Sequence, residues 1–296
     1  MRSILTPCLE VVQPLLLPPM KISLLFFSIL SGLSVALVAF LPLIPQAKIG
    51  RGFFRFNIFL SLFFLILLFP LKPYVNFKVP AQMMVHLTPS PNHMVWAMTL
   101  FLIFAVMITL LFLQFGRLPE KHVNPLLYVT AVFIGIFAVI LDSFLYRPTL
   151  GGWWGENILV PLNIMSSTAL LGSSVFAMLL GHWYLVQFDL DKQLLRRVSI
   201  VFVFALLLRC LVLGISLFVY RDNLLPMISL QGHGLFFWMR VGMGILLPII
   251  LAYMIYETAK MGANQACTGL LYIVVLFIFM GEAVSRYLFF LKGIPL

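Results

Sequence analysis

Long apolar runs separated by short polar segments dominate this chain. Each run is long enough, at 1.5 Å per helical residue, to cross a hydrocarbon core of about 30 Å. The runs lack the alternation of apolar and polar residues that is typical of a barrel strand, so they predict helices. The expected fold class is an all-α integral membrane protein, a bundle of about eight transmembrane helices. We expect the spans at residues 22–44, 54–70, 94–115, 125–146, 161–187, 198–220, 234–257 and 268–291.

The chain shows no internal repeat and no linker, so residues 20–296 are expected to form a single transmembrane helical bundle. Residues 1–19 are proline-rich and contain no span. They form an N-terminal extension with two interpretations: a native segment, or a non-native one added by an upstream start, with Met20 as the initiator. The run after Lys21 resembles a signal peptide, but it continues to Ile44 without a convincing cleavage site, which favours a retained first helix.

Composition supports the membrane class. Apolar and aromatic residues make up 62% of the 296 residues, charged residues only 9%, and the mean hydropathy is +1.11. A soluble domain typically has about a quarter charged residues. The net charge of +10 does not indicate nucleic-acid binding, because the basic residues lie mainly in connecting segments, where they meet lipid headgroups. The three cysteines are far apart and have neither metal nor haem-attachment spacing.

The basic residues of the connecting segments set the expected orientation. One side has nine of them: Lys48, Arg51, Arg55, Arg117, Lys121, Lys192, Arg196, Arg197 and Lys260. The other side has seven: Arg2, Lys21, Lys72, Lys78, Arg147, Arg221 and Lys292. The excess predicts a multi-pass protein of the cell inner membrane with both termini on the outer, periplasmic side. The outer loops then include residues 147–160, where Trp153 and Trp154 favour an interfacial loop or, alternatively, a lid over a pocket.

Ionisable residues inside the spans are the candidate functional residues, because a charge in hydrocarbon needs a partner or a purpose. On the expected topology they fall mostly in the outer half of the bilayer, together with a small polar group at the start of the fifth span. The charged members are Asp142, Arg209, Arg240, Glu282 and Arg286, and the polar group is Asn163, Ser166, Ser167 and Thr168. We expect them to point into the bundle.

Glu282 and Arg286 are four residues apart and so share one helix face. One interpretation is a self-neutralising pair that locks the bundle. The other is a polar ligand pocket, in which Glu282 accepts or relays a proton and Arg286, Arg240, Asp142 and Arg209 bind the ligand. Arg209 has no partner within its own helix and must find one across the bundle.

The remaining motifs are more typical of helix packing and interfacial hydrogen bonding than of a binding site. Only His182 is clearly inside a span, and interfacial hydrogen bonding is the expected role of the histidines; haem ligation by His93 and His233 is the alternative. Small residues recur in the fifth span (Ala169, Ser173, Ala177, Gly181) and the first (Ser28, Gly32, Ala36), which predicts close helix packing. Gly242, Gly244 and Pro248 make the seventh span a candidate for a kink. We find no motif for a bound metal.

The last span, with Gly281-Glu282 followed by Ser285-Arg286 and the aromatic residues Tyr287, Phe289 and Phe290, resembles the membrane-anchor subunits of dimethyl sulfoxide reductase and polysulfide reductase. By motif the likeness covers about ten residues, and Ser285 stands where that family usually has glycine. It implies a subunit that passes electrons between a quinone and an iron–sulfur partner without holding a redox centre. It also implies that Glu282 and Arg286 lie near the quinone.

The leading hypothesis is therefore a quinone-interacting membrane subunit of a respiratory-type redox complex. It would anchor an iron–sulfur or cytochrome partner and would be at most a non-catalytic-centre subunit of an oxidoreductase. The expected cofactors are none bound covalently, a quinone as ligand, and no haem; the expected partners are the lipid bilayer and that subunit, with no nucleic acid. The alternatives are a small-solute transporter or channel, and a structural or assembly subunit without a ligand.

Overall fold

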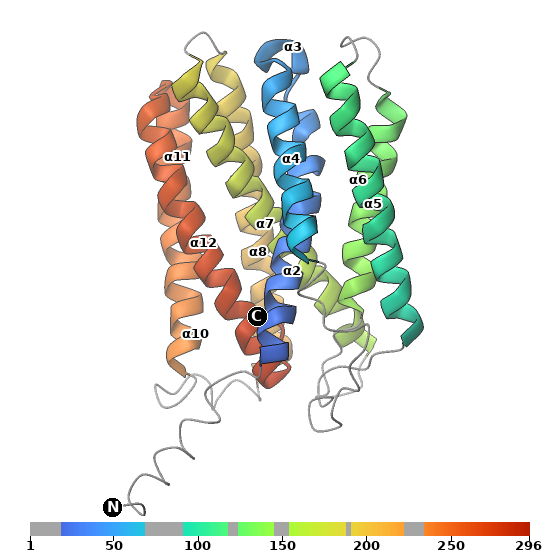
Figure 1. The fold of residues 1–296 in the computed structure, drawn as a ribbon. Helices are drawn as coiled ribbons and strands as arrows, with labels where there is room; N and C mark the ends of the chain where they lie inside the picture. The colour runs from blue at the N-terminus through green and yellow to red at the C-terminus, as the bar shows by residue number, and fades with distance from the viewer. Residues whose placement is uncertain (1–18, 69–90, 118–123, 145–153, 188–190, 222–233) are drawn as a thin grey trace, which may run out of the picture.

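The computed structural model describes residues 19–68, 91–117, 124–144, 154–187, 191–221 and 234–296. Within these ranges all regular secondary structure is helical (Figure 1). Eight of the described helices are long and apolar enough to cross a membrane. The expected all-α bundle of about eight transmembrane helices is confirmed. Most of the N-terminal extension and residues 145–153 of the tryptophan-containing loop lie outside the described residues.

The spans follow one another up and down the bundle. They are α2 (Pro19–Ala39, continued by the 3₁₀ turn η2, Leu41–Leu43), α4 (Arg51–Leu68), α5 (Pro91–Arg117), α6 (Pro125–Ser143), α7 (Trp154–Val186), α8 (Lys192–Val219), α10 to α11 (Gly234–Val241 and Leu247–Met261) and α12 (Asn264–Lys292). A short helix, α3 (Gln46–Ile49), connects the first two spans, and a π-helical turn, η7 (Gly242–Leu246), joins α10 to α11.

Several helices begin before the apolar runs that predicted them. Helix α8 begins at Lys192 instead of residue 198, because the Asp191 side chain accepts a hydrogen bond from the Gln193 amide at 3.0 Å and caps it. Helix α7 begins at Trp154, so the prediction of a loop over 147–160 is wrong for residues 154–160. The length of an apolar run reflects the thickness of the hydrocarbon core. The helix itself extends beyond the run into the headgroup layer, as far as the residue that caps it.

Helix α7 occupies the centre of the bundle and packs against α2, α6, α8 and α12 (Figure 1). Small residues allow this. A Cβ atom placed on Gly172 would lie 2.1 Å from the Ala36 Cβ of α2, and one on Gly181 would lie 2.7 Å from the Thr268 hydroxyl of α12. The prediction that small residues in the first and fifth spans serve close packing is therefore confirmed.

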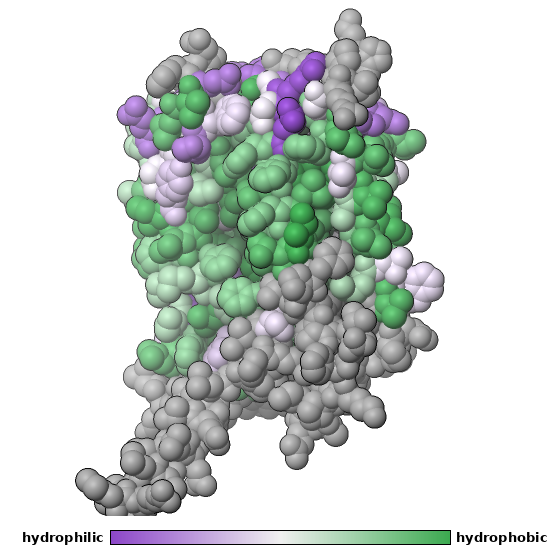
Figure 2. Space-filling view, in the orientation of Figure 1, coloured by the Kyte–Doolittle hydropathy of each residue, from purple (hydrophilic) through white to green (hydrophobic). Residues whose placement is uncertain are grey.

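The outer surface of the bundle carries large apolar side chains, as expected of a surface that contacts lipid (Figure 2). Phe133 on α6 is 69% exposed and Phe218 on α8 is 74% exposed. Hydrophilic residues gather at the end of the bundle where α3 lies. At this end the Lys48 ammonium donates to Asp191 at 2.6 Å and links α3 to the start of α8. The ion pair also holds the pKa of Asp191 below its ordinary value.

Candidate functional site

Three arginines and one glutamate meet inside the bundle, in the half away from α3. Arg209 comes from α8, Arg240 from α10, and Glu282 and Arg286 from α12. All four are buried: none is more than 2% exposed. We call these four residues the arginine–glutamate cluster. The expectation that ionisable residues of different spans point into the bundle is thus confirmed for α8, α10 and α12.

Arg209 is surrounded by acceptors. Its Nε donates to Glu282 Oε1 at 2.8 Å, and its Nη2 donates to Glu282 Oε2 at 2.9 Å, a two-pronged contact that matches the planar guanidinium to the carboxylate. Nη2 also donates to the Ser285 hydroxyl at 3.1 Å and to the main-chain oxygen of Leu296 at 2.9 Å. Nη1 reaches the Ser166 hydroxyl at 3.4 Å. Arg209 therefore joins α7, α8, α12 and the residue at position 296.

Arg240 is the opposite case. It is 0% exposed, and its Nη2 lies 3.0 Å from Glu282 Oε1, which makes an ion pair. None of its three guanidinium nitrogens, Nε, Nη1 and Nη2, makes a hydrogen bond of acceptable geometry to the described part of the protein. A guanidinium can donate several hydrogen bonds, and a buried donor without an acceptor carries a cost of about 1–3 kcal/mol. Arg240 thus presents donors that the described residues do not use.

The backbone next to Arg240 is irregular. The chain passes from α10 into the π-helical turn η7, in which the Leu247 amide donates to the Gly242 carbonyl. Pro248 follows and has no N–H to donate to a regular α-helical ladder. The sequence made these residues a candidate for a kink; the structure has a π turn here, an irregularity at which helices often kink and which is frequent at functional sites.

Two glycines let α12 approach this turn. A Cβ atom on Gly281 would lie 2.3 Å from the Gly244 Cα, and a Cβ atom on Gly244 would lie 2.6 Å from Arg240 Nη1. The backbones are therefore in direct contact at the position that precedes Glu282, and the Arg240 guanidinium packs over the Gly244 backbone. This contact sets the distance between Arg240 and Glu282.

The partners of Glu282 differ from the simplest sequence expectation. The one-turn spacing suggested a pair with Arg286, whereas the carboxylate is held by Arg209 and Arg240 from two other helices. Arg286 lies close enough to interact electrostatically with Glu282 and Arg240. Because both carboxylate oxygens accept from Arg209, the geometry favours Glu282 as the acceptor that positions the arginines. Its role as a proton acceptor stays a prediction.

Asp142 lies on a helix that is not a main packing partner of α8, α10 or α12. It is 3% exposed and lies on α6, which packs against α2, α5 and α7 on the other flank of the bundle from α10 and α12 (Figure 1). The main packing partners of α6 thus exclude the helices that carry the arginines, and the expectation that Asp142 shares a pocket with them stays a prediction. Of the small polar group, Ser166 reaches Arg209 by its hydroxyl and Asn163 by its main-chain oxygen, at 3.5 Å.

The histidine and cysteine predictions are tested only in part. The His182 ring Nδ1 lies 2.8 Å from the Tyr272 hydroxyl, which is the expected hydrogen bonding of an interfacial histidine. The side chains of His93 and His233 lie outside the described residues. Cys210 and Cys267 are free thiols. In the described ranges no three His, Cys, Asp or Glu side chains gather in a way that would hold a metal ion.

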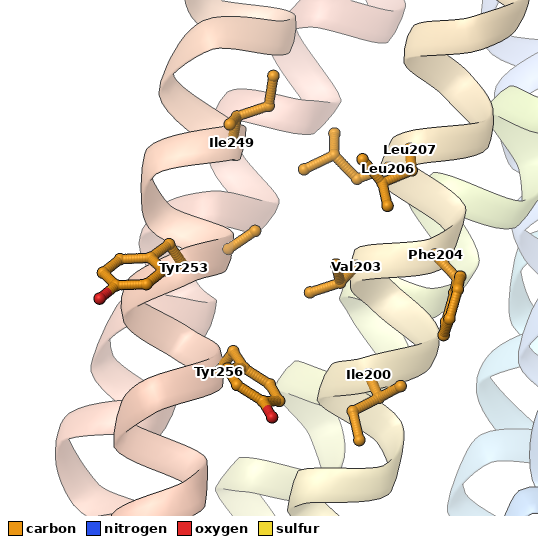
Figure 3. Close-up of a pocket in the computed structure, with 9 residues that line it drawn as sticks. Ile200, Val203, Phe204, Leu206, Leu207, Ile249, Tyr253 and Tyr256 are labelled. Carbon is orange, nitrogen blue, oxygen red and sulfur yellow. The ribbon is translucent and has the colours of Figure 1, made fainter.

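Two cavities lie elsewhere in the described structure. One, of about 410 Å³, is an apolar groove between α8 and α11 (Figure 3). The other, of about 420 Å³, is at the α3 end of the bundle, where Tyr184 and Leu185 of α7 face residues 262–266. Neither cavity is lined by a member of the arginine–glutamate cluster.

Chemically, the cluster is a positively charged donor site enclosed by helices. Its side chains carry three guanidinium groups and one carboxylate, so positive charge is in excess among them. Such a site favours a ligand with carbonyl, carboxylate or phosphate oxygens. The residues that sequence reasoning missed are Ser285 as a partner and Gly281 as a packing residue. Gly281 could have been identified from the sequence, because it directly precedes a charged residue, Glu282, within an apolar helix.

Neither a scan against protein-family models nor a search of the curated proteins finds a match to this chain. The likeness to the membrane-anchor subunits of dimethyl sulfoxide and polysulfide reductases stays a prediction, and it depends on the residues around Glu282 and Arg286. The chain itself is, by its helices, a multi-pass membrane protein.

Proposed function

We propose that this protein is a quinone-binding membrane subunit of a redox complex and that the arginine–glutamate cluster binds the quinone head group. The observation that carries the proposal is the buried Arg240 guanidinium: Nη2 is ion-paired with Glu282 at 3.0 Å, whereas Nε and Nη1 have no hydrogen-bond acceptor among the described residues. A quinone dissolves in the bilayer and can reach this depth without crossing water. Its carbonyl oxygens are uncharged hydrogen-bond acceptors. When bound, a quinone supplies a two-electron, two-proton redox couple.

In this proposal each residue of the cluster has a distinct role. Arg240 donates to the ligand, and Glu282 and Arg209 form the framework that holds Arg240 in place. Arg286 adds positive charge from the next turn of α12. The π turn η7 gives α10 a place to shift and admit the head group, because its hydrogen-bond ladder already departs from a regular helix there.

The test is binding of ubiquinone or menaquinone to the purified protein. Replacing Arg240 by Met removes the donors and should weaken binding about tenfold to a hundredfold, the range for losing a hydrogen bond from a charged group. Arg240→Lys should recover part of the affinity. Arg196→Met is the matched control, because Arg196 is an exposed residue at the other end of the bundle. Equal affinity of the Arg240→Met and Arg196→Met proteins would contradict the proposal.

The proposal includes an electron-transfer partner with an iron–sulfur or haem cofactor, because a bound quinone needs a donor or an acceptor for its electrons. It also includes the orientation in which the α3 end is cytoplasmic, since Lys48 lies in α3 and Arg51 and Arg55 lie in the first turns of α4. The cluster is then in the outer half of the bilayer. Co-purification under mild detergent tests the partner, and cysteine labelling at the α3 end from either side of the membrane tests the orientation.

The excess positive charge of the cluster favours a second candidate, a transporter of a small anion. It differs from the first in that it needs no partner and must move its substrate across the membrane. Flux of a labelled carboxylate or phosphate into proteoliposomes that contain only this protein would support it. Quinone binding without such flux would favour the first candidate.

A further inference from the structure

A groove of about 410 Å³ runs between α8 and α11 in the membrane-spanning part of the bundle (Figure 3). Val203 and Leu206 of α8 lie on one wall, and Ile249 and Tyr256 of α11 lie on the other. Apart from the two tyrosine hydroxyls its lining side chains are apolar. A groove of this composition suits a hydrocarbon chain and no polar ligand.

The groove is open to the lipid phase. Three of its lining residues, Phe204, Leu207 and Tyr253, are 67%, 56% and 69% exposed, and all lie within spans. At this depth the bilayer core offers only hydrocarbon to fill it. A molecule that binds in the groove can therefore enter sideways from the membrane.

The groove also leads toward the arginine–glutamate cluster. On α8, Leu206 is three residues before Arg209, about one helical turn. The groove positions Val203 and Leu207 continue along the same face of α8 to Cys210. The partly exposed Cys210 thiol is close enough to interact electrostatically with both Arg240 and Arg209. On the opposite wall of the groove, Ile249 of α11 lies just beyond the π turn that follows Arg240.

We infer that the groove between α8 and α11 binds the hydrocarbon tail of the same ligand whose head group accepts hydrogen bonds from Arg240. This inference rests on the proposed function and adds the class of ligand, a long-tailed lipid-soluble molecule, and its route, sideways between α8 and α11. An apolar groove on the lipid-facing surface lies one turn along α8 from Arg209, which shares the Glu282 carboxylate with the donor Arg240, and this arrangement suits the two parts of such a molecule.

The experiment compares two probes in nanodiscs of one lipid composition: decyl-ubiquinone and the same head group without a tail. Val203→Phe fills the groove, and Ala252→Phe fills it from the opposite wall. Leu208→Phe is the matched control, because Leu208 is on the same helix, is 43% exposed and does not line the groove. The midpoint of thermal unfolding shows that each variant is folded.

Val203→Phe should weaken decyl-ubiquinone binding about tenfold and leave binding of the tail-less probe unchanged. Leu208→Phe should change neither affinity. Equal affinities of the wild type and both groove variants for decyl-ubiquinone would overturn the inference, and so would an equal loss for both probes. If the wild type binds neither probe, the proposed function itself fails. Displacement of decyl-ubiquinone by added phospholipid would assign the groove to membrane lipid and also overturn the inference.

Discussion

The contact between α2 and α4 and the arginine–glutamate cluster are both polar, both buried and both formed between helices. In the first, Ser34 and Ser61 face each other with hydroxyls 2.8 Å apart, and each hydroxyl is also within hydrogen-bond distance of the other's main-chain oxygen, at 2.9 and 2.8 Å. Every polar group of that contact has a partner. In the second, Arg209 is satisfied and Arg240 is not.

Whether the buried polar groups have hydrogen-bond partners distinguishes a contact that only packs helices from a candidate ligand-binding site. Two hydroxyls are donors and acceptors at once, so a pair of serines can complete its own hydrogen bonds. Guanidinium groups only donate, and three of them exceed what one carboxylate can accept. A membrane helix bundle gains nothing in packing from the third arginine, since a buried charge is costly there. This contrast supports the proposed binding role of Arg240 and a packing role for the serines.

The largest effect is expected from Glu282→Gln. It leaves three buried guanidinium groups without their carboxylate, and breaking a buried ion pair costs about 3–5 kcal/mol. The midpoint of thermal unfolding in detergent should fall clearly. Glu257→Gln is the control, because Glu257 pairs with Lys260 at 3.8 Å on the exposed surface. Equal midpoints for the two variants would show that the cluster adds no stability.

Next come the two arginines that contact Glu282. Arg209→Met removes the bidentate contact and should destabilise the fold by about 3 kcal/mol, because Glu282 loses its main partner. Arg240→Met leaves that bidentate contact in place and should destabilise the fold less than Arg209→Met, while it weakens ligand binding about tenfold to a hundredfold. Unfolding midpoints of the two variants check this order. A larger loss for Arg240→Met would make Arg240 the structural residue.

The glycine contact between α12 and η7 is expected to matter somewhat less. Gly281→Ala places a Cβ against the Gly244 backbone and should cost about 1–3 kcal/mol through overpacking. Gly269→Ala is on the same helix, meets no atom within 4 Å, and should be neutral or slightly stabilising. Similar unfolding midpoints for Gly281→Ala and Gly269→Ala would mean that α12 can move away from η7 without loss of stability.

The smallest effect is expected at the serine contact. Ser34→Ala removes hydrogen bonds between neutral groups in a membrane, which average about 0.6 kcal/mol. The double variant with Ser61→Ala should be no worse than the single one, because it leaves no partner unsatisfied. A double-mutant cycle on the unfolding free energy measures this. A coupling energy between Ser34 and Ser61 as large as the loss of stability expected for Glu282→Gln would remove the contrast between the two regions.

The spans were predictable because each apolar run is long enough to cross the hydrocarbon, whereas the helix ends were not, since caps such as Asp191 lie outside those runs. The burial of Arg209, Arg240 and Glu282 followed from the cost of charge in lipid. Their partners did not follow. Glu282 binds Arg209, 73 residues away, rather than depending on its neighbour Arg286. Periodicity gives the face of a residue on its own helix but not which helix packs against that face.

The most direct measurement is a high-resolution map of the protein in lipid nanodiscs with decyl-ubiquinone present. We predict density for the head group within about 3 Å of the Arg240 guanidinium, the distance of a hydrogen bond, while Arg209 keeps its contact with Glu282. A map that shows the Arg240 nitrogens bonded to protein groups or water, with the quinone elsewhere or not bound, would contradict the account.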